Sequence, residues 1–252
     1  MPHRALTFGS AAAAYETFRL GYPDEVADAV LDYARRPVRT ALEIGAGTGK
    51  ATRLFDRRGM AVTATEPDAA MLAELRRHAQ PGTTTQQAAF EDLTPPPTYD
   101  LVYVAAALHW TSDEGRWPRM AGLLNPTGVF ANIGGPVRLA EPDLEEAVRT
   151  ARAPWLTDDD IPSPDGTAPS SILQWPGTEL ERSALFTDVR QVVIPRRVSM
   201  RSDRYVGNLS TVSAYLQLPQ RDRTQALDAI HRALPDEVEV LADVHVHLAR
   251  KA

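Results

Sequence analysis

Cysteine is absent from the 252 residues of this sequence. Its absence excludes disulfide bonds, thiolate metal sites and a cysteine nucleophile, and it fits a reducing compartment. Long apolar runs are absent too: the longest stretch, around Val102 to Leu108, is far shorter than the ~20 residues of a membrane-spanning helix. The alanines at 11–14 are followed at once by Glu16 and Arg19, which argues against a signal peptide. We therefore expect a cytoplasmic protein without a membrane partner.

Positive charge is also scarce. The sequence has 27 basic and 33 acidic side chains, a formal net charge of −6, and its lysines are Lys50 and Lys251 alone. Proteins that bind the nucleic-acid backbone neutralise its phosphates with lysine and arginine. The acidic balance, with no basic stripe along the chain, argues against a nucleic-acid partner. The hydrophobic fraction of 43% is ordinary for a globular protein.

Strand-like and helix-like segments alternate through the first half of the chain. This alternation predicts right-handed crossovers and a mostly parallel sheet. The expected strands are 40–44, 60–65, 86–89, 99–106 and 128–133, and the expected helices are 51–58, 69–78 and 116–124. In the second half we expect helices at 139–152, 177–186, 210–218 and 223–234, and two strands, 189–200 and 238–248, that extend the same sheet.

A glycine-rich loop, Gly45-Ala46-Gly47-Thr48-Gly49, lies between a predicted strand and a predicted helix. Glycine lets the backbone turn tightly and lets a ligand approach it closely, and the N–H groups at a helix start can face that ligand. The glycine spacing differs from that of dinucleotide-binding loops, and the Gly-Lys-Ser/Thr ending of a P-loop is missing. Glu43, just before the loop, would repel a pyrophosphate and attract an ammonium group. The loop therefore favours a cationic ligand that carries a nucleoside.

Glu66 ends the next predicted strand, roughly 20 residues beyond the glycines, where an acidic side chain can accept hydrogen bonds from both ribose hydroxyls. The alternative is a surface glutamate that caps the following helix. The glycine loop and this acid together are more specific than either feature alone.

Four stretches together resemble the class I S-adenosylmethionine-dependent methyltransferases: residues 41–50, Glu66, residues 90–93 and residues 99–110. The likeness is strong over about 38–135. Near the N-terminus, Tyr15, Arg19 and the pair Tyr22-Pro23 are similar to the small-molecule branch that includes trans-aconitate methyltransferase-like enzymes. The resemblance implies an α/β, Rossmann-like, seven-stranded mostly parallel sheet, its last strand antiparallel, with helices on both faces and an inserted helical cap.

No linker divides the chain, so we expect a single methyltransferase domain over residues 1–252. Its Pro-, Ser- and Asp-rich stretch at 154–176 predicts an irregular lid. The expected parts are an N-terminal helical cap (1–36), a cofactor-binding core (37–136), an inserted cap or lid (137–186) and C-terminal strands and helices that complete the sheet (187–252).

The resemblance implies S-adenosyl-L-methionine as cofactor and S-adenosyl-L-homocysteine as product. It places Glu43 near the ammonium group, Glu66 on the ribose and Arg19 near the carboxylate, although the family often has proline where Leu20 follows this arginine. The family also usually has a small residue where Phe90 stands. The other residues implied to surround the cofactor are Gly45, Ala46 and Gly47 beneath its methionine part, Ala105 beside it, Tyr15 folded over it, and Pro67, Met71, Phe90 and Glu91 around its adenine.

His109, just past the fourth predicted strand, is the expected catalytic base or substrate orienter; the alternative is a structural histidine beneath Trp110. Tyr22, Trp110, Tyr205 and Tyr215 are the expected walls of the acceptor pocket. His245 and His247 share one face of a strand that we expect at a sheet edge. No third ligand accompanies them, so we expect no metal.

The predicted function is methyl transfer from S-adenosylmethionine to a small-molecule acceptor by a monomer or homodimer. Two alternatives stay open. One is a nicotinamide-dependent oxidoreductase on a similar sheet, against which the glycine spacing and the lack of a Tyr-x-x-x-Lys pair count. The other is a protein that binds the cofactor without catalysis, which the loop and Glu66 do not exclude.

Overall fold

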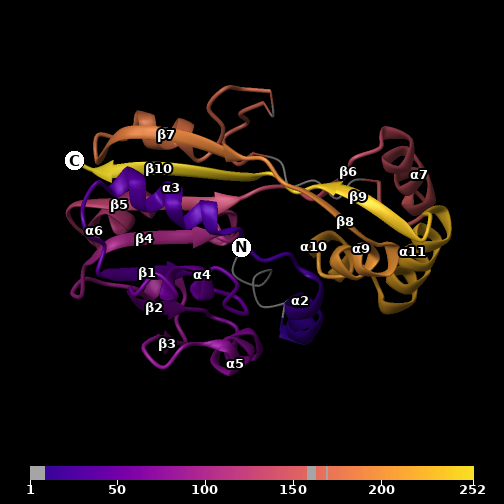
Figure 1. Ribbon diagram of the computed structural model, residues 1–252, viewed down its shortest axis with the longest axis horizontal. Coiled ribbons are helices and arrows are strands. Elements are labelled where there is room, and N and C mark those ends of the chain that lie inside the picture. The colour runs from indigo at the N-terminus through magenta and orange to yellow at the C-terminus, as the bar shows by residue number, and fades with distance from the viewer. Residues whose placement is uncertain (1–8, 158–162, 169) are drawn as a thin grey trace.

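The computed structural model describes residues 9–157, 163–168 and 170–252 of the chain. Two lobes lie end to end (Figure 1), one built on a seven-stranded sheet and a smaller one on a three-stranded sheet. The chain passes between the lobes at several points, among them the one where β7 (Phe186–Ile194) leads into β8 (Arg197–Arg201) and the one where β9 (Glu237–Leu241) leads into β10 (Val244–Lys251).

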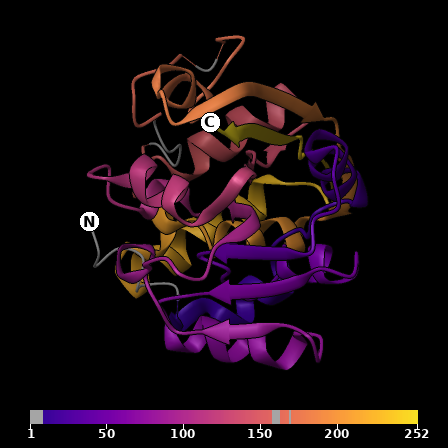
Figure 2. The ribbon, with the colours of Figure 1, turned by 90° about the vertical axis from the view of Figure 1, so that its left-hand side faces the viewer.

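The large sheet has the order β3-β2-β1-β4-β5-β10-β7. Its first five strands pair in parallel, and β10 lies antiparallel between β5 and β7. This order confirms the predicted seven-stranded sheet with its last strand antiparallel. Figure 2 shows the strands stacked from the violet and magenta end to the orange β7. The first five strands are β1 (Thr40–Ile44), β2 (Ala61–Thr65), β3 (Thr84–Gln86), β4 (Tyr99–Ala105) and β5 (Leu124–Gly134).

Both faces of the large sheet are covered by helices. On β4, Leu101 and Tyr103 lie in the core shared with α3 (Asp24–Ala34) and α4 (Thr52–Asp56), whereas Val102 and Val104 lie in the core shared with α6 (Arg116–Gly122). Burial on both faces explains why the strand is an almost continuous apolar run. α5 (Ala69–His78) and α8 (Gly177–Arg182) complete the layers. The arrowheads of β4 and β5 point toward the second lobe (Figure 1), so the carboxyl edge of the sheet faces it.

The second lobe, residues 138–152 and 197–241, has its own sheet in the order β6-β9-β8 and its own apolar core. Its other elements are β6 (Arg138–Leu139), α7 (Pro142–Arg152), α9 (Ser202–Leu209), α10 (Ser213–Leu216) and α11 (Gln220–Ala233). The lobe therefore draws on two distant parts of the chain, unlike the contiguous insertion at 137–186 that the sequence suggested. Residues 158–162 and 169 of that stretch lie outside the described residues.

The expectation that residues 187–252 only extend the large sheet is corrected by a bend in each late strand. Val244 pairs with Ile194 in the large sheet, whereas Leu241 pairs with Arg197 in the small one. Between these pairs lies Pro195, which cannot donate to a ladder, and the backbone N–H of Arg196 instead donates to the side chain of Asp243 at 2.8 Å. The two predicted strands thus each divide into two.

The N-terminal segment connects the two lobes. η1 (Gly9–Ala11) packs beside α5, and α2 (Ala12–Phe18) contacts both α5 and α9. The ring of Phe18 fills the space over Gly207 of α9, where an added Cβ would lie 2.4 Å from it. This places α2 next to the carboxyl edge of the large sheet (Figure 1).

Candidate active site

The glycine loop, residues 45–49, joins β1 to the start of α4. Its three glycines have φ angles of +65°, +58° and +85°, a region that side chains disfavour. A Cβ on Gly45 would lie 2.7 Å from the Cβ of Ala107. The N–H of Ala46 donates to the carbonyl of Thr65 at the end of β2, at 2.9 Å. The loop therefore needs glycine for its conformation, and at position 45 also for space.

Glu66 follows β2 and reaches back to the loop. Its Oε2 accepts from the N–H of Gly47 at 2.8 Å, and its Oε1 accepts from the N–H of Asp68 at 2.9 Å. Burial raises the pKa of Glu66, and these two backbone donors oppose the rise. Each carboxylate oxygen can accept a further hydrogen bond. Glu66 and the glycine loop, which the sequence spacing predicted to act together, are thus in direct contact.

Glu43, on β1, is fully buried. Its Oε2 accepts from the hydroxyls of Thr52, at 2.5 Å, and Tyr103, at 3.0 Å. Its Oε1 is buried and has no hydrogen-bond partner among the described residues. Burial raises the pKa of Glu43 to about 8, with smaller contributions from Glu66 and Asp56, while the two hydroxyl donors lower it. A buried oxygen without a donor costs about 1–3 kcal/mol, so this carboxyl is suited to a ligand that supplies one.

Asp68 and α5 form the next side of the site. The Oδ1 of Asp68 caps α5 by accepting from the N–H groups of Ala70 and Met71, at 2.8 and 3.0 Å. This cap sets Met71 beneath the loop, with its Cε 3.5 Å from where a Cβ on Gly47 would stand. Pro67 is half-buried beside it. Of the two residues expected near an adenine, Met71 therefore borders the loop, and the carbonyl of Pro67 accepts from the side chain of Gln87 at 3.1 Å.

η2 (Phe90–Asp92) lies after β3. The Phe90 ring is buried in the core beneath the sheet, with the Arg119 guanidinium 5.8 Å from its centre. Glu91 is exposed, and its Oε1 accepts from the N–H of Ser112 at 2.7 Å. This bond ties η2 to the loop that follows β4. In this arrangement the ring of Phe90 serves packing, and a role for this segment toward adenine stays a prediction.

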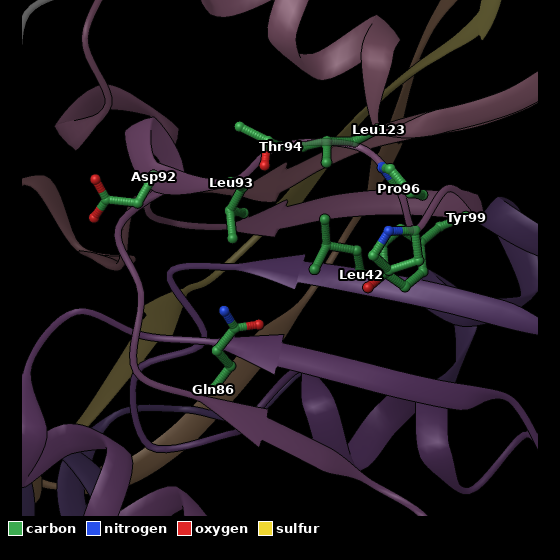
Figure 3. A pocket seen from close by; sticks show the side chains of 9 residues that line it. Leu42, Gln86, Asp92, Leu93, Thr94, Pro96, Tyr99 and Leu123 are labelled. Carbon is green, nitrogen blue, oxygen red and sulfur yellow. The ribbon is translucent and has the colours of Figure 1, made fainter.

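A cavity of about 180 Å³ lies beside η2 (Figure 3). Leu42 and Gln86 border it from β1 and β3, and Leu93, Thr94 and Pro96 border it from the connection to β4. Parallel strands are usually joined through a helix that covers the sheet, but this connection holds only the three-residue η2. The cavity therefore marks uncovered sheet and does not include the glycine loop.

His109 lies on η3 (Leu108–Trp110), directly beyond β4. Between them, Ala105 ends the strand and Ala106 has a φ of +53°, a backbone conformation that is uncommon for alanine. The His109 and Trp110 ring centres are 4.5 Å apart. Burial, and then the charge of Arg116, lower the pKa of His109 to about 4. The imidazole is therefore neutral at pH 7 and able to accept a proton.

Tyr15, Arg19 and Tyr22 approach the site from the N-terminal segment. The Arg19 Nε and Nη2 donate to the Oγ1 and carbonyl of Thr211, at 2.8 and 3.1 Å, and its guanidinium lies 5.3 Å from the Tyr15 ring centre. Tyr22 is half-buried; its burial raises its pKa, as do Tyr15 and Glu43. Tyr22, expected in the acceptor pocket, thus lies in the same neighbourhood as Glu43.

Tyr205 and Tyr215, also expected to line an acceptor pocket, lie in the core of the second lobe. Tyr205 is 2% exposed and Tyr215 is fully buried. The Tyr215 hydroxyl accepts from Arg152 at 3.4 Å. Both rings fill this apolar core, so the structure corrects the picture of open pocket walls at these two positions.

Sequence reasoning missed the hydroxyls on Glu43 and the ion pairs above the glycine loop. Tyr103 interrupts an apolar strand, and a buried tyrosine usually needs a partner for its hydroxyl, so this residue carried a usable signal. Glu16 of α2 accepts from Arg53 at 2.7 Å, and its carboxylate lies 3.6 Å from Lys50. These pairs join residues 34 and 37 positions apart, and nothing in the local pattern indicated them.

The strand that carries His245 and His247 is β10, which lies inside the large sheet and not at the edge where we expected it. Each imidazole bonds a glutamine oxygen at 2.9 Å, His245 to Gln174 and His247 to Gln191.

Within the described ranges, no three side chains of the metal-binding types gather into a possible ion site. None of the helices there is long and apolar enough to cross a bilayer.

Comparison with known proteins shows what the core is similar to. Residues 41–128 match a family described as a methyltransferase domain. An uncharacterised methyltransferase of Mycobacterium tuberculosis is 40% identical over 125 residues, 49% of this chain and 50% of that protein. A trans-aconitate 2-methyltransferase of Methylobacterium nodulans is 34% identical over 116 residues, 45% of this chain and 44% of that protein. The matched part of the chain thus spans about half the length of these curated relatives.

A solved structure extends the likeness to the whole fold. A candidate type II methyltransferase from Anaeromyxobacter dehalogenans superposes with a TM-score of 0.64 at 22% identity, over 92% of this chain and 98% of that chain. The second lobe is therefore part of a shared architecture.

The segment that matches the methyltransferase-domain family, residues 41–128, contains the glycine loop and most of the parallel strands of the large sheet, so this part of the chain is similar to the class that the sequence indicated. The trans-aconitate 2-methyltransferase is among the proteins to which this segment is similar, as the sequence predicted. The match favours this class over a nicotinamide-dependent oxidoreductase.

Proposed function

We propose that this protein transfers the methyl group of S-adenosylmethionine to a small-molecule acceptor and leaves S-adenosylhomocysteine. The observation that carries the proposal is Glu43: a fully buried carboxyl, beside a loop of left-handed glycines, with one oxygen to which none of the described residues donates. The ammonium group of an amino-acid ligand would supply that donor and an opposite charge. A pyrophosphate would meet repulsion at the same place.

The residues around the loop fit the remaining parts of such a cofactor. The backbone of Gly45, Ala46 and Gly47 would lie beneath its methionine part, and Glu66 would accept from the ribose hydroxyls. When bound, the cofactor supplies a methyl group already activated on a sulfonium. The residues that we assign to the rest of the cofactor, as predictions, are Tyr15, Arg19, Pro67, Met71, Phe90, Glu91 and Ala105.

The protein's own part in the reaction is alignment, exclusion of water and removal of a proton. Alignment and desolvation account for much of the rate when the donor is already reactive. α2 and the second lobe lie at the carboxyl edge of the sheet and would restrict access of water. His109 is neutral at pH 7, so its imidazole would accept a hydrogen bond from an acceptor hydroxyl or amine and orient it, and would take up the proton as the methyl group is transferred.

A small acceptor is favoured by the position of the site. The carboxyl edge of the large sheet faces the second lobe, and Trp110 beside His109 is the wall that we assign to the acceptor. The net charge of −6 argues against a nucleic-acid acceptor. A cytoplasmic location and a monomeric or homodimeric state are further predictions from the sequence.

Isothermal titration calorimetry with S-adenosylmethionine and S-adenosylhomocysteine tests the cofactor assignment. We expect saturable binding of both by the purified protein, and a Gly45→Val variant, which meets Ala107 and a strained φ, should lose it. No binding of either compound to the folded wild-type protein would end the proposal.

Turnover with a panel of small acids, amines and phenols, followed by mass spectrometry, tests the transfer itself. We expect His109→Ala to lower turnover more than cofactor affinity, because the imidazole acts on the acceptor. Cofactor binding with no methylated product across the panel would favour the alternative, a binding protein without catalysis.

A further inference from the structure

Arg116 is a buried cation behind the predicted catalytic turn. It is the first residue of α6 and only 2% exposed, whereas arginine is almost never this buried unless its charge is paired. Arg116 is not among the residues that we assign to the cofactor or to the acceptor. Its burial therefore calls for an explanation in terms of what its guanidinium holds.

The guanidinium of Arg116 bonds three residues from two segments of the chain, Thr111 and Asp113 in the loop before α6 and Glu179 on α8. Its Nε donates to the Oγ1 of Thr111 and its Nη2 to the Thr111 carbonyl, both at 2.9 Å. Nη2 also pairs with the carboxylate of Asp113. Nη1 lies 3.5 Å from the Oε2 of Glu179 on α8, and that same oxygen accepts from the indole of Trp117 at 2.9 Å. Two carboxylates thus neutralise the buried charge.

Thr111 transmits these contacts to η3. Its Oγ1 donates to the carbonyl of Leu108 at 2.7 Å, and its N–H donates to the same carbonyl at 3.1 Å. Leu108 is the first residue of the turn, and His109 and Trp110 complete it. A continuous chain of polar contacts therefore runs from Glu179 through Arg116 and Thr111 to the turn that presents His109.

We propose that Arg116 is a positioning residue. By donating hydrogen bonds to both the hydroxyl and the carbonyl of Thr111, it holds in place the turn that carries His109 and Trp110, a set of bonds that we call the grip of Arg116 on the turn. Glu179 anchors the guanidinium from α8. The proposal rests on the proposed function only in that His109 is taken to act on the acceptor. The grip itself is a property of this chain.

The charge of Arg116 adds a second effect on His109. Burial is the larger cause that lowers the pKa of His109, and Arg116 is the charged group that adds to it. The Trp110 ring packs against the imidazole and carries no charge. Arg116 therefore acts on His109 in two ways, by holding the turn that carries it and by adding to the lowering of its pKa that burial causes.

Histidine NMR on protein labelled in its imidazole rings tests the proposal without any acceptor. The His109 signals are assigned by their loss in His109→Gln. Removing the charge with Arg116→Met should shift the His109 ring signals and raise their titration midpoint by roughly 1 pH unit. Arg119→Met is the matched control, because Arg119 lies on the same helix and donates to a backbone carbonyl, that of Leu93 at 3.0 Å; it should change neither.

Variants at Thr111 separate the effect of the hydrogen bonds from that of the Arg116 charge, because they change the bonds and leave the charge in place. Thr111→Val keeps the shape of the side chain and the carbonyl but removes the hydroxyl that links Arg116 to Leu108. It should move the His109 ring signals, and Thr111→Ser should restore them. Where an acceptor is known, Thr111→Val should lower kcat about tenfold and leave cofactor affinity within about twofold of wild type.

The outcomes are decisive in both directions. Unchanged His109 signals in folded Arg116→Met and Thr111→Val would overturn the positioning role. If Arg116→Met does not fold, the Thr111 pair decides alone. Should calorimetry show no cofactor binding, the proposed function fails, yet the NMR result still establishes or removes the grip of Arg116 on the turn.

Discussion

The cofactor end of the large sheet, residues 40–78, and the second lobe differ in how they are stabilised, although the second lobe also buries a polar atom, Asn208 Oδ1, that has no hydrogen-bond partner among the described residues. At the cofactor end, buried polar atoms such as Glu43 Oε1 and Thr48 Oγ1 lack partners among the described residues, and the loop backbone is left-handed at three glycines. The core cluster of the second lobe consists of aliphatic and aromatic side chains, including Tyr215 and Ile230. The first region carries local costs that a ligand can offset, whereas the second is stabilised by ordinary packing.

This comparison predicts the largest effect on stability in the second lobe. Tyr215→Ala removes a fully buried ring and should lower the free energy of unfolding by about 3–5 kcal/mol, as other large-to-small core changes do. Tyr215→Phe keeps the ring and removes the hydroxyl that accepts from Arg152 at 3.4 Å, so it should cost about 1 kcal/mol. Urea unfolding measures both. A loss below about 1 kcal/mol for the alanine variant would contradict a packing role for this ring.

Cofactor affinity should respond at the other end. Glu66→Ala removes the acceptor that also holds the N–H of Gly47, so we expect binding to weaken by about 1–3 kcal/mol, the scale of charged hydrogen bonds. Asp203→Ala, a control on the surface of α9, removes an exposed pair with Arg201 and should leave affinity unchanged. Calorimetry distinguishes the two. Wild-type affinity in Glu66→Ala would remove this residue from the site.

The two regions also differ in how far their sequence predicted them. The glycine loop and Glu66 lie about 20 residues apart, and their roles depend on a strand–loop–helix pattern that is visible locally. α5 was predicted at 69–78 and is found at Ala69–His78. Here propensity, periodicity and capping by Asp68 agree, and local consistency of this kind is what sequence reasoning detects.

The second lobe could not be predicted in the same way because its sheet depends on distant pairings. β6, β8 and β9 come from residues near 138, 199 and 239, and alternation shows that a segment is a strand without showing its partner. The residues around Pro195 and Asp243, where the two strands bend, lie inside the strand-like stretches 189–200 and 238–248, so the sequence predicted one continuous strand at each place. At the site, Tyr103 and Arg116 acquire their roles only through contacts that the fold creates.

The buried carboxyl of Glu43 makes the comparison dependent on pH. Its pKa is about 8 in the folded protein and 4.5 ordinarily, so the folded state binds this proton more tightly than the unfolded chain, and stability should fall as pH rises from about 4.5 to 8. A cationic ligand favours the carboxylate. Affinity for S-adenosylmethionine should therefore increase from pH 6 to 8, by up to about tenfold per unit.

Titrations at several pH values test this dependence. Glu43→Gln cannot ionise and should bind more weakly with a flatter pH profile. The same slope in Glu43→Gln as in wild type would assign the dependence to another group, of which Glu66, whose pKa is also raised by burial, is the first to check.

The smallest expected effect concerns α2, which touches both regions. Glu16 pairs with Arg53, at 2.7 Å, and Lys50 beside the glycine loop, while Arg19 at the other end of α2 bonds Thr211 of the second lobe. The Glu16 side chain is 19% exposed, and partly exposed pairs contribute about 0.2–1 kcal/mol.

Glu16→Gln should weaken cofactor binding within that range and leave unfolding of the second lobe unchanged. A double-mutant cycle with Arg53→Met isolates the pair energy from calorimetric affinities. A coupling near zero in binding would mean that α2 is held in place by the contacts of Phe18 and Arg19 with the second lobe, and that the ion pair with Arg53 adds nothing measurable.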